Sequence, residues 1–417
     1  MDVSHVKILA PVGSFAVLEA AIKAGADEVY FGATALSMRQ GSGHNFAPAE
    51  FNKLAQRCHQ DGVKANLTLN SMLYGEDLAT AFALIDEAKK ADIDAVIAVD
   101  MAVIQYAKNA DVEVHMSVQT GIANIESVRF YSQFADRIVL AREVNIAQQA
   151  EIVKQIKDQH ITGPKGRLVE IEVFAHGALC VSVSGKCGMS LLSTNKSANR
   201  GQCTQPCRHA YTVTDKETGQ QFDVDNEFVM SSADLCTLGF LDEIAASGVA
   251  VLKIEGRQKP IEYVDTVVRT YKQALDALAK DEFTQTAIDG WLDQLKTVYN
   301  RGLGSGYYLG KTFKEWSGVA GSRATTTKTY VGSVQHVFEK AGVVEVLIHS
   351  GTLSVKDEII IMGDRTGLVR VLVSELRDAD QKSVDTIEKG SVCTFQVPEL
   401  CRENDKVYLI QETGFRA

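Results

Sequence analysis

Four of the eight cysteines lie in one short stretch and are the residues best suited to chemistry. Cys180, Cys187, Cys203 and Cys207 are separated by six, fifteen and three residues. The segment from Val173 to Thr214 contains no Asp or Glu, although the whole chain has a formal net charge of −10. Thiolates stay ionised when positive charge or a metal lies close to them. The stretch therefore predicts a centre at which thiolates bind a soft metal.

Three interpretations compete for these cysteines. The first residues, MDVSHVKILAPVG, lack the pattern of a secretory signal, so we expect a reducing, cytoplasmic location that disfavours disulfides. Structural zinc usually takes two close cysteine pairs, and only Cys203 and Cys207 form such a pair. An iron–sulfur cluster accepts wider gaps. From spacing alone the cluster is our first interpretation, zinc the second and unliganded thiols the third.

The same stretch carries a local excess of positive charge on an acidic chain. Its cations are Lys186, Lys196, Arg200 and Arg208. Phosphate contacts need only one positive face, so this patch is compatible with RNA, whereas the acidic body argues against a surface that binds nucleic acid everywhere.

Length and composition indicate a globular protein with one large and one smaller domain. The chain has 417 residues, of which 45% are hydrophobic and 23% charged. No apolar run approaches the ~20 residues that a membrane span needs, so we expect no membrane association. The scattered cysteines Cys58, Cys236, Cys393 and Cys401 are expected to be small buried hydrophobic residues.

The elements that must position the cysteines alternate between β-strands and helices. Helical patterns such as Phe15–Ala24, Leu78–Lys90 and Ile146–Lys157 separate short β-branched runs. Eight such units predict a closed (β/α)8 barrel of the TIM type, with an open doubly wound sheet as the alternative. The expected strands are Lys7–Val12, Glu28–Gly32, Val63–Leu69, Ala95–Val99, Val112–Val118, Arg137–Ala141, Glu170–Ala175 and Ala250–Ile254.

Barrel active sites lie at the carboxyl ends of the strands, so polar residues there are candidate site residues. The cysteine stretch follows the seventh strand and is expected to cap the same end. Polar residues also occur simply because loops begin there, and Arg142–Glu143 and Glu255–Arg257 are alternatively ion pairs that close the barrel. His115 is as compatible with a hydrogen-bonded core histidine. The candidates are Arg39, Asn70, His115, Gln119, Arg142, Glu143, His176, Glu255 and Arg257.

The rest of the chain predicts two exit helices and a second, all-β domain. Helical patterns over Pro260–Lys280 and Ala287–Val298 lead into a glycine-rich loop, Tyr299–Lys311. Six short strands beyond the Ser317–Thr326 linker predict a small antiparallel β-barrel. We therefore expect a barrel domain over residues 1–316, with the Cys-rich insertion at 176–235 and exit helices at 260–310, and a β domain over 327–417.

The chain resembles the peptidase U32 family, also called the collagenase-like protease family. The resemblance rests on LAPVGS, DEVYFGA, EVHMSVQTGIAN, RIVLARE, FAHGALCVSVSGKCGMS with NRGQCTQPCR, and LKIEGR. It extends from about Ile8 through YNRGLGSGYYLG, and the C-terminal strands resemble the family's appended β domain. The cysteine motif is the most specific part.

The resemblance implies an oxygen-independent hydroxylase with a 4Fe–4S cluster and prephenate as oxygen donor. Cys180, Cys187 and Cys203 match the family's cluster ligands. Cys207 matches the fourth ligand of the RNA-modifying members, and Cys236 is the reserve candidate on the pattern of the ubiquinone-type members. Among the arginines, Arg39, Arg142 and Arg257 are candidates to bind the two carboxylates of prephenate.

We therefore predict an RNA hydroxylase that acts on a pyrimidine. The tRNA wobble uridine in the anticodon loop is our first candidate and an rRNA cytidine the second, because the enzyme must reach a base outside the stack. The alternatives are a collagenase-like peptidase and a subunit of a ubiquinone-ring hydroxylase complex, which would have a protein partner. The sequence lacks H-E-x-x-H and G-x-S-x-G motifs, which lowers the peptidase alternative.

Overall fold

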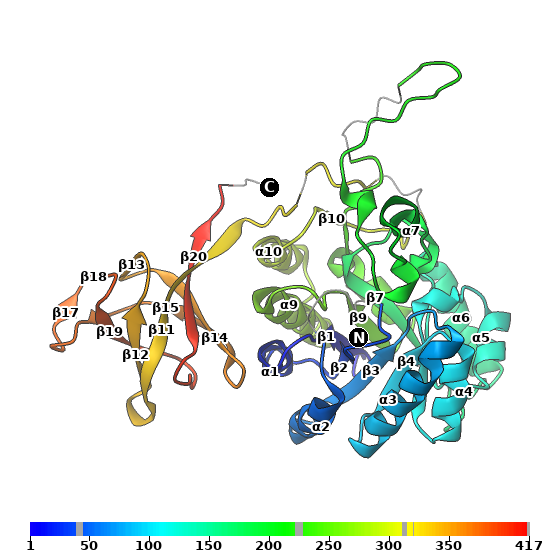
Figure 1. The fold of residues 1–417 in the computed structure, drawn as a ribbon, viewed down its shortest axis with the longest axis horizontal. Helices are drawn as coiled ribbons and strands as arrows, with labels where there is room; N and C mark the ends of the chain where they lie inside the picture. Colours follow the sequence, from blue (N-terminus) through cyan, green and yellow to red (C-terminus); the bar gives the residue numbers. More distant parts are fainter. Residues whose placement is uncertain (39–44, 222–227, 311–314, 320, 415–417) are drawn as a thin grey trace.

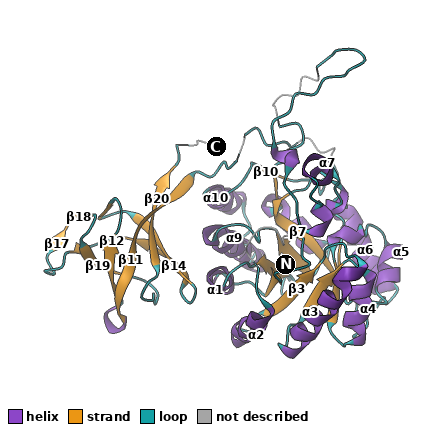
Figure 2. Ribbon diagram, viewed as in Figure 1, coloured by secondary structure: helices purple, strands orange, loops and turns teal. Residues whose placement is uncertain are grey.

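The structure is a computed structural model that describes residues 1–38, 45–221, 228–310, 315–319 and 321–414. Figure 1 shows a barrel surrounded by helices, with a smaller group of strands beside it. Figure 2 shows that helices cover the outside of the barrel, whereas the smaller group consists mainly of strands. Among the described helices, none is long and apolar enough to cross a membrane.

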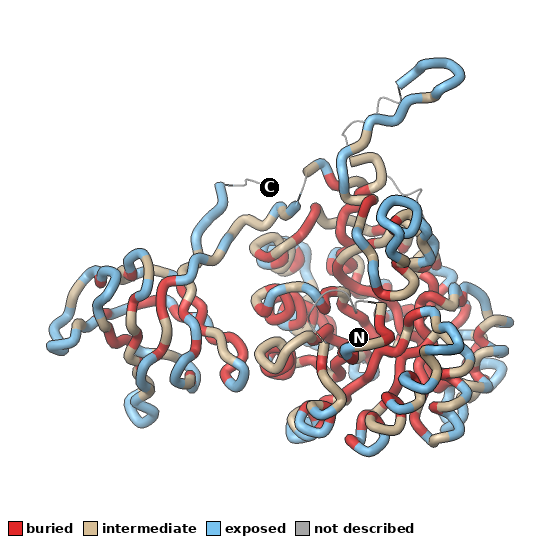
Figure 3. The backbone as a smooth tube through the Cα atoms, in the orientation of Figure 1, coloured by how far each residue is buried: buried red, intermediate tan, exposed pale blue. Residues whose placement is uncertain are grey.

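Eight parallel strands close the barrel, which confirms the predicted fold class. Each strand pairs in parallel with the next along the chain, and the last, β9, pairs with both β7 and β1. Buried residues concentrate on these strands (Figure 3). The strands are β1 (Lys7–Pro11), β2 (Glu28–Gly32), β3 (Lys64–Leu69), β4 (Ala95–Ala98), β5 (Glu113–Met116), β6 (Arg137–Val139), β7 (Glu170–Ala178) and β9 (Val251–Ile254).

Helices with one apolar face pack on the outside of the strands. In α3 the buried residues Ala81, Leu84, Ile85 and Ala88 recur at helical spacing and face the barrel. Side-chain caps fix where several helices begin; Ser14, for example, accepts a hydrogen bond from the backbone N–H of Val17. The helices are α1 (Phe15–Lys23), α2 (Phe51–Gln60), α3 (Leu78–Lys90), α4 (Met101–Asn109), α5 (Ile125–Tyr131), α6 (Ile146–Asp158), α8 (Leu241–Ala246), α9 (Ile261–Ala279) and α10 (Gln285–Lys296).

The Cys-rich segment leaves the barrel after β7 and contains the short helix α7 (Met189–Thr194). In Figure 1 this segment, which includes the label α7, lies at the upper edge of the barrel, near β10. The chain returns through β8 (Asp234–Cys236), which runs antiparallel to β7. Strand β10 (Leu303–Gly304) then pairs with β8, so part of the glycine-rich stretch expected to be a loop is a strand.

The C-terminal strands form an antiparallel sheet with its own hydrophobic core. It contacts the barrel through α1 and α9, where Ala20 and Ile261 pack against Ile360 and Leu368. The predicted boundaries at residues 316 and 327 remain predictions. The strands are β11 (Thr326–Phe338), β12 (Val343–Ile348), β14 (Glu358–Gly363), β15 (Gly367–Leu372), β16 (Leu376–Arg377), β17 (Ser383–Val384), β19 (Val392–Gln396) and β20 (Lys406–Glu412), with β13 (Thr352–Ser354) and β18 (Thr386–Glu388) as a separate pair.

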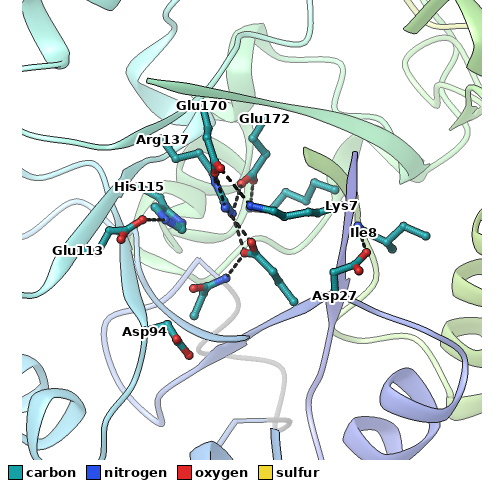
Figure 4. Close-up of polar contacts among 12 residues, drawn as sticks. Lys7, Ile8, Asp27, Asp94, Glu113, His115, Arg137, Glu170 and Glu172 are labelled. Atoms are coloured by element: carbon teal, nitrogen blue, oxygen red, sulfur yellow. Dashed lines mark hydrogen bonds and ion pairs between the residues drawn. The ribbon is translucent and has the colours of Figure 1, made fainter. Parts of the chain in front are cut away.

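A buried ion cluster occupies the amino ends of the barrel strands (Figure 4). Arg137, the first residue of β6, donates to both carboxylate oxygens of Glu28 at 2.6 and 2.7 Å. It also donates to Glu170 at 2.7 Å, and Glu172 lies 3.7 Å away. The hydrogen bonds and charge of Arg137 outweigh the effect of burial and lower the pKa of Glu28 to about 2. This end of the barrel is therefore closed by mutually compensated charges.

Candidate active site

A pocket opens at the carboxyl ends of the barrel strands, and we call it the mouth pocket. Residues at the ends of β2, β3, β6, β7 and β9 line it together with the Cys-rich segment. Of the site residues predicted from the sequence, it brings together Asn70, Gln119, Arg142, Cys180, Cys187, Cys203, Cys207, Arg208, Glu255 and Arg257.

All four cysteines of the motif line this pocket as free, partly buried thiols. Burial raises the pKa of the Cys207 thiol, the Arg208 charge opposes that rise, and the three other cysteines add to it. The four sulfurs therefore belong to one electrostatic environment. Their role as metal ligands remains a prediction.

Cys236, the reserve candidate, lies elsewhere. It is fully buried on β8, where its sulfur accepts from the Tyr271 hydroxyl at 3.9 Å. Burial raises the pKa of its thiol to about 11. Cys236 is not among the described residues that line the mouth pocket. This placement favours Cys207 over Cys236 as the fourth thiol of the motif.

Four cysteine thiols are a donor set that suits an iron–sulfur cluster, and hydrogen-bond donors lie beside two of them. The Met189 N–H donates to the Cys187 sulfur at 3.3 Å, and the Ser190 hydroxyl lies 3.9 Å from the Cys203 sulfur. Such hydrogen bonds tune cluster sulfurs. One zinc ion would need sulfurs about 4 Å from one another, because each Zn–S bond is about 2.3 Å long. Within the described ranges, no group of three or more His, Cys, Asp or Glu side chains is placed to hold a metal ion, so the zinc and the cluster interpretations both stay predictions.

Arginines surround the cysteines with positive charge. The Arg142 guanidinium donates to the Ala178 carbonyl at 2.9 Å and lies 3.9 Å from the centre of the Phe174 ring. Arg208 donates to the Leu179 carbonyl at 2.7 Å. Because carbonyl oxygens carry no net charge, these contacts orient the two guanidinium groups and leave their charge available to an anion.

Arg257, another predicted arginine, occupies space that is free because residue 32 is a glycine. It is 6% exposed and donates to the Thr68 hydroxyl at 2.9 Å. A Cβ atom on Gly32 would overlap with the Arg257 guanidinium and with the Asn45 side chain. Glycine at position 32 therefore makes room for the arginine at the end of β2.

Two cationic residues that line the mouth pocket, Lys253 and Arg301, were not predicted from the sequence. Lys253 donates to Glu172 at 2.7 Å, and its ammonium lies 4.6 Å from the centre of the Tyr30 ring. Burial lowers its pKa, and Glu172 opposes that effect. A lysine within the otherwise apolar strand VLKI was an available signal. Arg301 lies 3.4 Å from buried Asp234 and belongs to the stretch interpreted as an exit loop.

Several other predicted site residues do not line the mouth pocket. His176 is buried beside Tyr271, and burial, with a smaller effect of Lys259, lowers its pKa to about 3. His115 lies at the amino end of the barrel, 3.2 Å from Glu113. Glu143 accepts from the Ser184 N–H at 2.9 Å.

The remaining three predicted residues lie at the rim or are not described. Lys186 is exposed between two residues that line the pocket, Gly185 and Cys187. Arg200 pairs with Asp77 at 2.7 Å. Arg39 lies outside the described residues.

The chain is similar to one protein family and to relatives of two kinds, proteins named collagenase and proteins named for RNA hydroxylation. The family model described as peptidase family U32 matches residues 13–318. A Porphyromonas gingivalis protein named collagenase is 48% identical over 408 residues, covering 98% of each chain. Bacillus subtilis tRNA hydroxylation protein P1 is 28% identical, covering 91% of this chain and 88% of its own. Escherichia coli 23S rRNA 5-hydroxycytidine C2501 synthase is 34% identical, covering 67% of this chain and 40% of its own.

Proposed function

This chain belongs to peptidase family U32 and is an enzyme, and from that premise we propose that it hydroxylates a pyrimidine in RNA without molecular oxygen. The observation that carries the proposal is the mouth pocket, where four thiols and several arginines converge. The names of two relatives, a tRNA hydroxylation protein and an rRNA 5-hydroxycytidine synthase, support the reaction class.

We propose that the four motif cysteines hold a 4Fe–4S cluster. Hydrogen-bond donors already lie beside two of the sulfurs, and the adjacent Arg208 guanidinium offsets thiolate charge. When bound, the cluster would supply one-electron chemistry that side chains lack. Cys180, Cys187, Cys203 and Cys207 would be its ligands.

The co-substrate that we propose is the dicarboxylate prephenate. Among the described residues that line the mouth pocket, five are cationic, namely Arg142, Arg208, Arg257, Arg301 and Lys253, and one, Glu255, is a carboxylate. Guanidinium groups bind carboxylates through two parallel hydrogen bonds, so Arg142 and Arg257 are suited to fix the diacid. The buried position of Arg257 would keep water from competing for its carboxylate.

Atoms and electrons constrain this reaction. Hydroxylation replaces a C–H bond of the base by C–OH, and the oxygen would come from the hydroxyl group of prephenate. If prephenate becomes aromatic with loss of carbon dioxide, two electrons and two protons remain. We propose that two molecules of a one-electron carrier protein accept those electrons, one each, with the two protons leaving to solvent.

The target base must leave its stack to reach a pocket at the end of a barrel. A tRNA anticodon loop already presents unstacked bases, and so does an rRNA loop. We therefore propose the tRNA wobble uridine first and an rRNA cytidine second, in the cytoplasm. A ubiquinone-type hydroxylase subunit would instead take its fourth thiol from Cys236, which lies outside the mouth pocket.

A peptidase is the second candidate, because the relative with 48% identity is named collagenase. Hydrolysis by a serine or cysteine nucleophile needs an adjacent base. None of the described residues lining the mouth pocket is a histidine, and His176 is buried with a pKa of about 3. These observations favour hydroxylation over peptide cleavage.

Nucleoside mass spectrometry of RNA tests the proposal. A strain lacking this gene should lose a hydroxylated pyrimidine that the parent strain contains, and the intact gene should restore it. Blocking chorismate synthesis should cause the same loss, because prephenate derives from chorismate. Identical RNA profiles in all strains, with peptide cleavage by the pure protein, would place the peptidase first.

A further inference from the structure

An exposed aromatic residue lies in the loop that follows Asn70, a residue that lines the mouth pocket. Tyr74, in the loop between β3 and α3, is 53% exposed. The Arg200 guanidinium from the Cys-rich segment lies 4.3 Å from the centre of its ring. An aromatic ring and a guanidinium plane are the two groups on which proteins stack single-stranded bases.

Contacts on both sides hold this pair in place. Arg200 donates to the Asp77 carboxylate at 2.7 Å and to the Met72 carbonyl at 3.2 Å. The same Asp77 accepts from the Tyr74 N–H at 2.8 Å, and the Met72 N–H donates to Asn199 at 2.8 Å. The Tyr74 ring is therefore presented on a fixed backbone, which limits the entropy lost when a ligand binds.

The pair lies within reach of the proposed reaction centre. Asn70 lines the mouth pocket only four residues before Tyr74, and four extended residues span at most ~14 Å. On the other side, Asn199 donates to the Cys187 carbonyl at 3.3 Å, next to Arg200. A nucleotide next to one in the pocket could therefore reach Tyr74.

The charges near Tyr74 differ from those at Lys186 and Lys196, and this difference distinguishes a subsite for a base from subsites for phosphates. Asp77 compensates Arg200, and Glu76 is exposed next to it, so this spot does not favour a phosphate. Lys186 and Lys196 are also exposed, and among the described residues neither forms an ion pair. Each lies within two residues of a residue that lines the pocket.

We propose that Tyr74, held by Arg200, stacks a base flanking the target nucleotide in single-stranded RNA, while Lys186 and Lys196 contact its phosphates. This inference rests on the proposed function, because it takes RNA as the substrate. It adds a binding subsite in the β3–α3 loop that is separate from the reaction centre.

Fluorescence anisotropy with a labelled tRNA anticodon stem-loop tests the subsite. Tyr74→Ala should weaken binding about ten-fold without changing the dependence on salt, because a stacking contact releases no counterion. Tyr74→Phe, which keeps the ring, should bind as the wild type does. Lys186→Ala and Lys196→Ala should each lower the salt slope by about one. Phe338→Ala removes another exposed ring, on β11, and should have no effect.

The outcomes separate this inference from the proposed function. Equal RNA affinity of wild type and Tyr74→Ala, with both folded by circular dichroism, would overturn the subsite and leave the RNA hydroxylase intact. A wild-type protein that binds collagen peptide but no RNA would overturn both proposals. A ten-fold loss in Tyr74→Ala alone, with Tyr74→Phe unaffected, is the result that we expect.

Discussion

The two ends of the barrel both contain buried charge, but they treat it differently. At the amino end, Arg137 is bonded to Glu28 and Glu170, and each of these two contacts joins opposite charges (Figure 4). At the carboxyl end, Arg142 and Arg208 donate to neutral carbonyl oxygens. The first end is complete without a ligand, whereas the second retains positive charge.

The two ends distinguish buried charges that stabilise the fold from buried charges that are available to a ligand. Paired charge at the amino end of a barrel is typical of stability, and polar residues at the carboxyl end are typical of catalysis. Lys253 contacts both regions. Its ammonium donates to Glu172 of the buried ion cluster, and its side chain also lines the mouth pocket.

The largest expected effect comes from the thiols of the mouth pocket. Cys207→Ser should abolish hydroxylation, because an alcohol does not replace a thiolate ligand. The anaerobically purified variant should also contain much less iron and sulfide than the wild type. Cys236→Ser, the matched control, should retain both. Iron and sulfide analysis with visible absorption spectroscopy measures this, and the opposite pattern would make Cys236 the fourth ligand.

At the amino end, Arg137→Met should lower the free energy of unfolding by about 3–5 kcal/mol, because it leaves buried carboxylates without a partner. Arg142→Met at the mouth should cost only about 1–2 kcal/mol, since it strands a carbonyl instead of a carboxylate. Denaturation by urea measures both. Equal losses would contradict the contrast between the two ends.

The ion pair of Glu28 with Arg137 should make the stability of the amino end depend on pH. The Glu28 pKa falls from 4.5 to about 2 in the folded protein, so its contribution to stability is complete above pH 4.5 and is lost as the pH falls toward 2. Without Arg137, burial alone would raise that pKa, and protonation would stabilise the variant. The difference in unfolding free energy between wild type and Arg137→Met should therefore begin to shrink as the pH falls through the raised pKa of the variant, and shrink further between pH 4.5 and about 2 as the wild type loses stability. Urea denaturation across this range measures it, and a constant difference would argue against this assignment.

A smaller effect is expected at Gly32. Gly32→Ala should displace the Arg257 guanidinium and lower hydroxylation about ten-fold, since a misplaced binding group costs far more activity than stability. Arg257→Lys should act in the same direction because an ammonium lacks the two-pronged geometry. Gly290→Ala on α10, where a Cβ meets no atom within 4 Å, is the control. Steady-state kinetics and thermal unfolding would separate the two effects, and unchanged turnover in Gly32→Ala would remove Arg257 from the site.

Periodicity predicted the barrel well because each strand is a short apolar run followed by an amphipathic helix; α3 has the predicted bounds, Leu78–Lys90. Arg142 and Arg257 were candidates for the same reason, because they follow strands directly, and both line the mouth pocket. His115 and Lys253 were harder to assign, because strands buried on both faces give no alternation that tells whether a side chain points into the barrel or toward the helices. Arg301 was not predicted because its position depends on a short strand pairing. Strand β8 has only three residues after a long insertion, and β10, which begins two residues after Arg301, pairs with it.

The most direct test of the account uses the pure protein. Wild-type enzyme, prephenate, an electron acceptor and RNA from the deletion strain should be incubated without oxygen, and the nucleosides analysed by mass spectrometry. We expect a pyrimidine that gains one oxygen atom. That atom should be labelled when the prephenate hydroxyl carries heavy oxygen, and the modified nucleoside should be absent with Cys207→Ser. Unmodified RNA from a cluster-loaded protein that cleaves denatured collagen in the same buffer would contradict it.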